Sequence, residues 1–417
     1  MQRVARNLPF SGANGRLLLP LRCDPNWHRD CSCVCMQFIQ GDMHDMGARL
    51  KVGVVGLGAW GCNVARCLYE MPECDLVICS DLNEGRCSMA QRNWNVQTVA
   101  SLDEMLAQHP EIEAVVISSP ATTHYSLAKK AMLADKDVFV EKPFTLNVRD
   151  AEELSALAAA KRRILMVGHL LEYHPAVNRI REIIQSGDLG EIYYIYTQRV
   201  NLGRIRGDEN ALWSFAPHDL SQILYILGED PVDVSARGQS FIQDGIEDVV
   251  FLSLFFANRR MAHIHISWLD PHKMRSTTVV GSKKMLVFDD AAASEKLRIY
   301  DSGAQSPATC SYGEAIQVRF GDIQIPHLIT TEPLKLEFQH FINCVEKRIT
   351  PRSDSQDGLR VVRILEAAQK SLEMDGLPVS LHSGSVSKTL HSPQIINRQW
   401  TPSLPMVPGM PVVAAHS

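Results

Sequence analysis

The sequence predicts an α/β protein with an N-terminal doubly wound parallel sheet and a second, α+β domain with an open, mostly antiparallel sheet. Between Arg49 and His169, short apolar runs alternate with helical patterns, as in a parallel sheet that helices cover on both faces. After about Pro175, strand-like segments follow one another with short connections and few helices, as in an antiparallel or mixed sheet.

The first domain is assigned to residues 48–172. Its predicted elements are, in order, the strand LKVGVVGLG, a helix over 63–69, the strand DLVICSD, a helix around Ala90, the strand EAVVISS, a helix over 124–133, the strand DVFVEKP, a helix over 148–160 and the strand ILMVGH. A strand-helix alternation of this kind is typical of a nucleotide-binding sheet.

The second domain is assigned to residues 173–378. Its predicted strands are EIYYIYTQRV, DVVFLSLFF, RMAHIHISWL, STTVVG and KMLVFDD. Its predicted helices cover 219–227, 332–347 and 357–373, and we expect a late helix to pack back on the first domain. Residues 379–417 are rich in Ser and Pro without a sustained period, which predicts a flexible tail.

Residues 1–47 are predicted to be an N-terminal extension without stable structure. Cys23, Cys31, Cys33 and Cys35 lie near His28, and thiolates and imidazole suit a soft metal ion. The Cys-x-Cys-x-Cys spacing lacks the two-residue gap of common zinc knuckles, so no metal site is predicted. The first stretch has several Arg and no acid, a weak transit-peptide pattern. We instead expect translation to begin just before the first strand, at a later methionine.

Composition excludes several classes of function. A net charge of −5 and the absence of a long basic run argue against nucleic acid as a partner. No apolar stretch approaches the roughly 20 residues of a membrane-spanning helix. The chain has eleven cysteines, and those in the first domain show no disulfide-framework spacing. This favours a reducing compartment and a cytoplasmic location.

The stretch GVVGLGAWG predicts a dinucleotide site. Gly56, Gly58 and Gly61 form G-x-G-x-x-G between a strand and a helix, and Ala59 and Trp60 complete the turn. The glycines allow a tight turn, a close approach of the backbone to a pyrophosphate, and packing of the helix on the strand.

Asp81 ends the next strand about 20 residues further on. A carboxylate at this position can accept hydrogen bonds from both ribose hydroxyls and would repel a 2′-phosphate, so the predicted cofactor is NAD rather than NADP. Arg86 and Arg92 lie nearby and leave NADP open, because an arginine can neutralise a 2′-phosphate.

Two later strands also end in polar residues, at the edge where such sheets bind ligands. After the third predicted strand, Ser118, Ser119, Pro120, Thr122 and His124 are candidate cofactor contacts. His124 has two competing interpretations, as a catalytic group and as a residue satisfied by local backbone at the start of a helix.

The fourth predicted strand ends in Glu141, Lys142 and Pro143, where Glu141 and Lys142 are candidate cofactor contacts. The residue before a proline is held extended, and a cis Lys142–Pro143 bond would turn the ammonium toward the cofactor crevice. There, Lys142 can transfer a proton with a lowered pKa or stay charged and hold a substrate hydroxyl.

The glycine-rich turn, the acid after the second strand and Glu-Lys-Pro after the fourth resemble the glucose-fructose oxidoreductase/inositol dehydrogenase/rhizopine catabolism (Gfo/Idh/MocA) family, over about residues 51–377. The resemblance implies that Lys142 contacts nicotinamide and substrate and that Pro143 is cis. It also implies that the open sheet forms a substrate floor and an oligomer interface, which predicts a homodimer or homotetramer.

The family also carries an Asp-x-x-x-His on a helix of the second domain. Here His218 matches the histidine, but Ser214 stands in the aspartate position. Asp219 is no obvious replacement, because adjacent residues of a helix point apart. His218 is the predicted catalytic base, since an imidazole titrates near neutral pH. The competing interpretation is a helix-capping histidine beside Pro217.

Three segments resemble the branch of UDP-N-acetylglucosamine and UDP-N-acetylglucosaminuronate 3-dehydrogenases: NLGRIRGDENALWSFAPHDLSQILYILG, SWLDPHKMRSTTVVGSKKMLVFDD and EPLKLEFQHF. Basic or polar residues there and nearby are candidate substrate contacts, and for the basic ones the alternative is a solvated surface charge. These candidates are Tyr173, Asn201, Arg204, Arg206, Lys273 and Arg275.

The resemblance therefore implies NAD-dependent oxidation of the C3 hydroxyl of a UDP-linked N-acetylated amino sugar. The 3-keto product would feed a 3-aminotransferase in lipid A or surface-polysaccharide synthesis. Two alternatives stay open at this stage: an inositol, free-sugar or dihydrodiol dehydrogenase of the same family, and an NAD-binding regulator without turnover.

Overall fold

A computed structural model describes residues 49–203, 205–305, 317–329 and 331–381. The predicted N-terminal extension with its cysteines, the candidate Arg204 and the tail beyond residue 381 lie outside these described residues. The described residues all belong to one compact unit by their contacts, and so do both sheets.

The first sheet is parallel and has the strand order β3-β2-β1-β4-β5-β6, which confirms the doubly wound prediction. Its strands are β1 (Leu50–Val55), β2 (Cys74–Ser80), β3 (Gln97–Val99), β4 (Ala114–Ile117), β5 (Asp137–Glu141) and β6 (Leu165–Gly168). Chain order reverses between β1 and β4, so the crevice outside their carboxyl ends is the place where such sheets bind ligands.

Five helices accompany this sheet: α1 (Ala59–Glu70), α2 (Glu84–Trp94), α3 (Leu102–Gln108), α4 (His124–Leu133) and α5 (Val148–Lys161). Asn83, Ser101 and Asn147 begin three of them by accepting hydrogen bonds from the first-turn amides. The predicted series lacked β3 and α3, because their short, mixed segments carry no clear apolar period.

The second sheet has the order β16-β13-β12-β11-β7-β10-β9-β8-β17, and within it only the pair β7 and β10 is parallel among the described strands. This confirms an open, mostly antiparallel sheet. Its strands are β7 (Ile192–Val200), β8 (Asp233–Gln239), β9 (Val249–Phe255), β10 (Met261–Ser267), β11 (Met274–Gly281), β12 (Met285–Asp289), β13 (Leu297–Tyr300), β16 (Ile323–Gln324) and β17 (Val379–Ser380). A separate hairpin pairs β14 (Gly303–Gln305) with β15 (Gln317–Arg319).

Strand β17 corrects one boundary. Residues from 379 onward were predicted to be flexible, but Val379 and Ser380 pair with Val234 and Asp233 of β8. An edge strand offers unpaired backbone groups, and even a two-residue segment without apolar alternation can bond to them.

Helix α7 (Ala211–Leu227) begins eight residues before its predicted start at Asp219. Asn210 caps it by accepting from Trp213 N, and Pro217 lies inside it. An interior proline removes one backbone hydrogen bond and clashes with the preceding turn, so residues before Pro217 are not expected in the same helix from sequence alone. The apolar packing of α7 outweighs that cost, as most of its residues are buried. His218 therefore lies in mid-helix, which excludes the capping role considered above.

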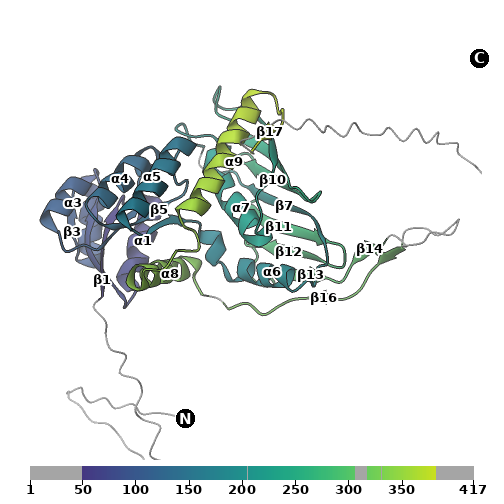
Figure 1. The fold of residues 1–417 in the computed structure, drawn as a ribbon, viewed down its shortest axis with the longest axis horizontal. Helices are drawn as coiled ribbons and strands as arrows, with labels where there is room; N and C mark the ends of the chain where they lie inside the picture. Colours follow the sequence, from purple (N-terminus) through teal and green to yellow (C-terminus); the bar gives the residue numbers. More distant parts are fainter. Residues whose placement is uncertain (1–48, 204, 306–316, 330, 382–417) are drawn as a thin grey trace, which may run out of the picture. The chain divides into compact units, whose positions relative to one another are not determined.

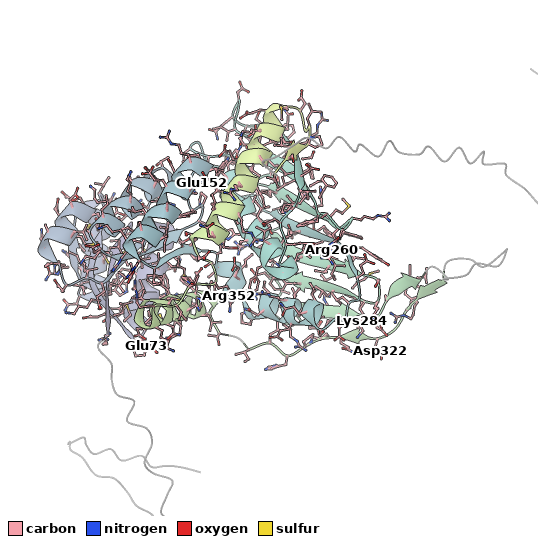
Figure 2. The ribbon with its side chains drawn as sticks, viewed as in Figure 1. Glu73, Glu152, Arg260, Lys284, Asp322 and Arg352 are labelled. Atoms are coloured by element: carbon pink, nitrogen blue, oxygen red, sulfur yellow. The ribbon has the colours of Figure 1, made fainter. Side chains whose placement is uncertain are left out.

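Three further helices connect the two sheets: α6 (Pro175–Gln185), α8 (Pro333–Lys347) and α9 (Ser355–Glu373). Phe338 and Phe341 of α8 pack on Phe139 of β5 in the first domain. Helix α9 lies beside α5 and the second sheet, in yellow-green in Figure 1, and supplies apolar residues to a core on each side. An ion pair between Arg363 and Glu152, the latter labelled in Figure 2, links α9 to α5. No helix among the described residues has the length and apolar character that crossing a bilayer requires.

Candidate active site

The turn after β1 needs its glycines. Gly56 has φ +97°, and a Cβ there would lie 2.6 Å from the backbone nitrogen of Ser119. A Cβ on Gly61 would lie 2.0 Å from the carbonyl oxygen of Gly56, so α1 can approach β1 this closely only with glycine. A Cβ on Gly58 would meet no atom within 4 Å, so space lies in front of the turn.

The N-terminus of α1 opens onto this space. Gly58 is its N-cap and supplies no side-chain acceptor, and its first turn contains no acidic residue. The first amides of a helix lack intrahelical partners and carry partial positive charge, which suits a pyrophosphate. Ala59 and Trp60 in this first turn are exposed. The turn therefore fits the diphosphate of a dinucleotide.

Asp81 follows β2 and its carboxylate is fixed at the edge of the sheet. Oδ2 accepts a hydrogen bond from Leu57 N at 2.7 Å, and Oδ1 accepts one from Asn83 N at 2.8 Å. Arg86 Nη1 lies 3.4 Å from Oδ2 but is half-exposed. Arg86 Nη1 also donates long hydrogen bonds to both oxygens, at 3.5 Å to Oδ1 and 3.4 Å to Oδ2. Ribose hydroxyls could take the place of these two long bonds at Asp81.

We expect Asp81→Ala to weaken NAD binding by about 10-fold or more, because the hydrogen bonds from ribose to a charged acceptor are lost. The preference for NAD over NADP should fall as well, because the carboxylate no longer repels a 2′-phosphate. Titration of NAD and NADP followed by protein fluorescence measures both effects. Asp75→Ala, within β2, serves as the control, and an unchanged cofactor preference in Asp81→Ala would contradict the assignment.

The residues after β4 divide into two groups. Ser118 and Ser119 are half-buried beside the glycine turn, and Ser118 Oγ donates to Gly56 O at 2.8 Å. Pro120 and Thr122 are exposed. All four residues remain available to a cofactor, although the hydroxyls of Ser118 and Ser119 contact Gly56 O and Thr123 Oγ1 in this structure.

His124 is different, because its ring is 1% exposed and wedged between two backbone carbonyls. Nδ1 lies 2.8 Å from Pro143 O and Nε2 lies 2.9 Å from Ser119 O. Burial lowers the pKa of His124, and a neutral ring can donate to only one of these carbonyls. The predicted cofactor contact is therefore corrected: His124 braces the turns that carry Ser119 and Pro143, and its ring has no surface to offer a ligand.

Glu141 and Lys142 end β5 at the same edge, and the Lys142–Pro143 bond is cis, as predicted. Glu141 is buried and accepts a hydrogen bond from the indole Nε1 of Trp60 at 2.5 Å, which ties β5 to the glycine turn. Burial raises the pKa of Glu141. Burial lowers the pKa of Lys142, and the nearby charge of Glu141 opposes that shift.

The ammonium of Lys142 reaches the second domain. Its Nζ donates a hydrogen bond of 2.9 Å to the backbone carbonyl oxygen of Ser214 in α7. Ser214 occupies the position where the family pattern has an aspartate, and here its backbone carbonyl is the acceptor for Lys142. Ser214 lies about one helical turn before His218, and the charge of Lys142 helps to lower the pKa of that histidine.

His218 is half-buried, and among the described residues neither ring nitrogen forms a hydrogen bond with the protein. Burial lowers the pKa of His218 well below the ordinary value of 6.5, and the positive charges of Lys142, Arg199 and Arg275 lower it further. The ring is therefore neutral at neutral pH with a nitrogen free to accept a proton, as a general base requires.

The candidate substrate residues do not all meet at this site. The prediction of Tyr173 as a substrate contact is wrong, because its side chain is only 3% exposed. Its hydroxyl lies 3.1 Å from Ser353 Oγ, and Arg352, labelled in Figure 2, covers its ring. Lys273 is exposed before β11, and Asn201 is half-buried after β7. Arg206 is paired with Asp208 and Glu209, yet its charge still acts on Lys142.

A buried charged cluster behind the site was not predicted. His169 Nδ1 lies 2.8 Å from Asp357 Oδ2 and 3.3 Å from Glu172 Oε1, and the His169 and Glu172 side chains are each 1% exposed. Their donor atoms lie within 4.8 Å of one another, a spacing that a metal ion could use. The contacts of His169 with Asp357 and Glu172 already pair these side chains with one another, and we assign no metal to the cluster.

Protons shared in this cluster should make stability depend on pH. Its two carboxylates raise the pKa of His169 to about 9 against the effect of burial, while burial raises the pKa of Glu172 to about 8. Both groups bind protons more tightly in the folded state, so their contribution is complete below the unfolded pKa values and is lost as pH rises through the folded ones. The melting temperature should fall as the pH rises from about 4.5, the ordinary pKa of Glu172, to about 9, the folded pKa of His169. Glu172→Gln should flatten this slope in scanning calorimetry, and an equal slope would contradict the cluster's role.

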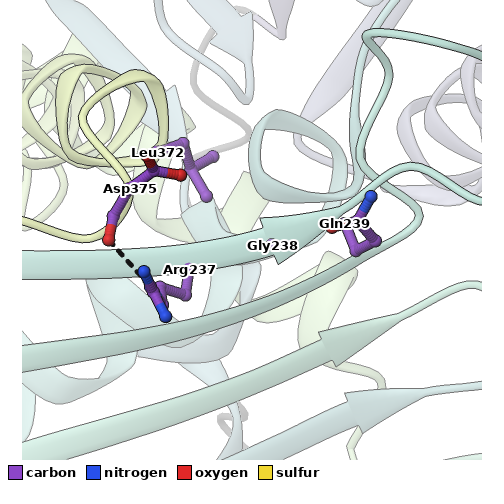
Figure 3. A pocket seen from close by; sticks show the side chains of 5 residues that line it. All are labelled: Arg237, Gly238, Gln239, Leu372 and Asp375. Carbon is purple, nitrogen blue, oxygen red and sulfur yellow. Dashed lines mark hydrogen bonds between the residues drawn. The ribbon is translucent and has the colours of Figure 1, made fainter.

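A polar pocket elsewhere does not belong to this site. Figure 3 shows its lining, Arg237, Gly238 and Gln239 of β8 with Leu372 and Asp375 at the end of α9. Arg237 Nε donates to the backbone oxygen of Asp375 at 2.7 Å. None of these residues is shared with the glycine turn, Lys142 or His218.

The parallel sheet with its glycine turn, and a lysine and a neutral histidine at its edge, define the class of a dinucleotide-dependent oxidoreductase. Residues 50–169 match the family model of the Gfo/Idh/MocA oxidoreductases, described as an NAD-binding Rossmann fold, and residues 177–287 match a C-terminal domain model of the same family. The chain belongs to the Gfo/Idh/MocA oxidoreductase family and its first domain binds NAD.

Several relatives have assigned reactions. The UDP-N-acetylglucosamine 3-dehydrogenase of Acidithiobacillus ferrooxidans is 31% identical over 196 residues, 47% of this chain and 60% of that protein. The myo-inositol 2-dehydrogenase of Thermotoga maritima is 24% identical over 334 residues, 78% of this chain and 96% of that protein. A solved structure of the Acidithiobacillus enzyme superposes with a TM-score of 0.66 at 23% identity, covering 79% of this chain and 99% of that one. Dehydrogenation of a CH–OH group is common to these two relatives, whereas their substrates differ.

Proposed function

We propose that this protein oxidises the C3 hydroxyl of a UDP-linked N-acetylated amino sugar, UDP-N-acetylglucosamine or its uronic acid, to the 3-keto sugar. The observation that carries the proposal is the convergence of Lys142 and His218, from two domains, through the 2.9 Å bond between Lys142 Nζ and Ser214 O. The product would be consumed by an aminotransferase, which requires a ketone.

The two side chains divide the work on the alcohol. His218, neutral at the pH of the reaction, removes the hydroxyl proton, and Lys142 donates a hydrogen bond to the oxygen as negative charge builds on it. Gly58, Asp81 and the N-terminus of α1 would hold NAD, which would supply the acceptor for the C3 hydrogen as a hydride. The alcohol thus loses one proton and one hydride, and the carbonyl forms. The charge of Lys142 also keeps the pKa of His218 low, so the base is not protonated before substrate arrives.

Two findings support a nucleotide sugar over a free polyol. Among the relatives, the 31% identity to a UDP-N-acetylglucosamine 3-dehydrogenase exceeds the 24% identity to an inositol dehydrogenase, although over a shorter segment. Basic residues also surround the base, with Arg199, Arg206 and Arg275 all acting on Lys142 or His218. An uncharged inositol would not need them. An inositol or free-sugar dehydrogenase is the second candidate.

The test is oxidation of each substrate class by the purified protein. The protein with NAD should form NADH with UDP-N-acetylglucosamine or its uronic acid and not with myo-inositol. Parallel samples with 2-oxoglutarate detect tightly held NADH that must be recycled before a second turnover. NADH formation with myo-inositol alone would contradict the substrate, and none with any substrate would favour a regulator.

We also propose that the protein forms a homodimer or homotetramer through the open face of its second sheet. Tyr194, Tyr196, Phe251 and Met261 are exposed there, and Phe251 stacks on His265 at 4.5 Å between ring centres. An apolar face of this kind is costly to leave in water. Sedimentation velocity should show an oligomer that Phe251→Asp dissociates, and a monomeric wild type would contradict this. We also propose a cytoplasmic location, which the unpaired state of the described cysteines supports.

A further inference from the structure

Two arginines stand directly opposite each other beside the candidate base. Arg199 of β7 and Arg275 of β11 are cross-strand partners in the antiparallel register. Side chains in such a pair share one face of the sheet, and like charges placed opposite each other are destabilising. A pairing of like charges that lowers stability in this way is commonly present because function requires it, not because it improves packing.

Only one of the two arginines has a counterion of its own. Arg199 holds Asp219 through two bonds, Nε to Oδ2 at 2.6 Å and Nη2 to Oδ1 at 3.3 Å. Arg275 Nη1 lies 3.9 Å from Asp290, and in the described part of the chain its guanidinium forms no hydrogen bond with protein.

Asp290 is also shared. His174 Nε2 approaches it at 3.5 Å and Lys296 Nζ at 3.6 Å, and the contact with His174 lowers the pKa of Asp290 to about 2. One carboxylate therefore serves three cationic or potentially cationic groups. The positive charge of Arg275 remains largely uncompensated.

Arg275 faces the catalytic helix. Thr277, two residues further along β11 and hence on the same face, accepts a hydrogen bond from Gln222 of α7 at 3.0 Å. The charges of Arg275 and Arg199 both act on His218 of that helix. An anion held by Arg275 would thus lie on the same side of the sheet as the reacting hydroxyl.

We propose that Arg275, with Arg199 behind it, binds a pair of anionic oxygens on the substrate, and so fixes which sugar is oxidised. The planar guanidinium matches two oxygens of a carboxylate or of a phosphate. On a UDP-sugar these oxygens come from a 6-carboxylate or from the diphosphate. The inference rests on the proposed function, because it places this anion on a nucleotide sugar. Arg199 is a positioning residue, since Asp219 occupies its own fork.

The test measures binding, so it does not depend on turnover. Titration calorimetry compares wild type, Arg275→Met and Arg275→Lys with three probes: UDP-N-acetylglucosaminuronate, UDP-N-acetylglucosamine and uridine. Arg275→Met should weaken binding of a charged probe by about 10- to 100-fold, and Arg275→Lys should lie between. Arg237→Met, on β8 of the same sheet and outside the site, is the matched control.

The probes separate the two sources of the anion. A loss confined to the uronate assigns Arg275 to the carboxylate, and an equal loss for both UDP-sugars with uridine unchanged assigns it to the diphosphate. Unchanged binding of all probes in Arg275→Met, or a loss that extends equally to uridine, would overturn the inference while leaving the proposed function intact. If wild-type protein binds neither UDP-sugar, the proposed function fails and the inference fails with it.

Discussion

Lys142→Met is expected to lower kcat for the sugar substrate by roughly 10²- to 10⁴-fold while NAD affinity changes by less than about 3-fold. Methionine keeps most of the side-chain length, so the glycine turn and β5 should remain in place. What is lost is the hydrogen bond to the substrate oxygen, which strengthens as the alkoxide forms, and an interaction of that kind appears in kcat rather than in binding. Steady-state kinetics with NAD and UDP-N-acetylglucosamine or its uronic acid measures the effect.

Lys130→Met is the matched control, because Lys130 is a surface lysine of the same domain, paired only with Asp103. Removing such an exposed ion pair should leave kcat within about 2-fold. Near-normal kcat in Lys142→Met would remove Lys142 from the chemistry. Loss of NAD binding together with kcat would instead make it a cofactor residue.

His218→Asn should lower kcat by a similar factor, roughly 10²- to 10⁴-fold, and should also change how the rate depends on pH. Because the pKa of His218 lies well below 6.5, wild-type kcat/KM should stay high to a pH below that value and fall only in more acidic solution. Burial lowers the pKa of Lys142 below 10.5, so the rate should fall again as Lys142 loses its proton, at a pH under that limit. The acidic limb should disappear in His218→Asn and the alkaline limb should remain.

His327→Asn, an exposed histidine outside both sheets, is the control for His218 and should keep wild-type rates at every pH. An acidic limb that survives in His218→Asn would assign that limb to another titrating group. Either outcome is read from the same kcat/KM profile.

Much of the site was predictable because its residues follow strands of clear apolar pattern. Gly56, Asp81, Ser118 and Lys142 each come directly after a buried strand, and parallel strands bring their carboxyl ends to one edge. The residue types then suffice to predict a dinucleotide site, since a G-x-G-x-x-G turn with a carboxylate after the following strand is typical of few other sites. The helix over 124–133 was predicted with its observed bounds, because its apolar period is regular.

The second domain was less predictable, because its functional contacts depend on tertiary neighbours. The acceptor for Lys142 is the backbone carbonyl of Ser214, which no residue type in the sequence indicates. Pro217 made the first two turns of α7 look unlike a helix. Arg199 and Arg275 are separated by 75 intervening residues and meet only through the register of β7 and β11. The cluster of His169, Glu172 and Asp357 likewise forms across β6, the following turn and α9. Sequence spacing carries no signal for pairings of this kind.

In the proposed reaction, Lys142 and His218 act on the C3 hydroxyl of a nucleotide sugar. Single-turnover kinetics with UDP-N-acetylglucosamine deuterated at C3, compared with the same sugar deuterated at C4, tests it directly, with the uronic acid examined in the same way. A primary isotope effect on NADH formation is expected only with deuterium at C3, because only that bond breaks to the cofactor. An isotope effect at C4 and none at C3, or NADH formation from myo-inositol and from neither UDP-sugar, would contradict the claim.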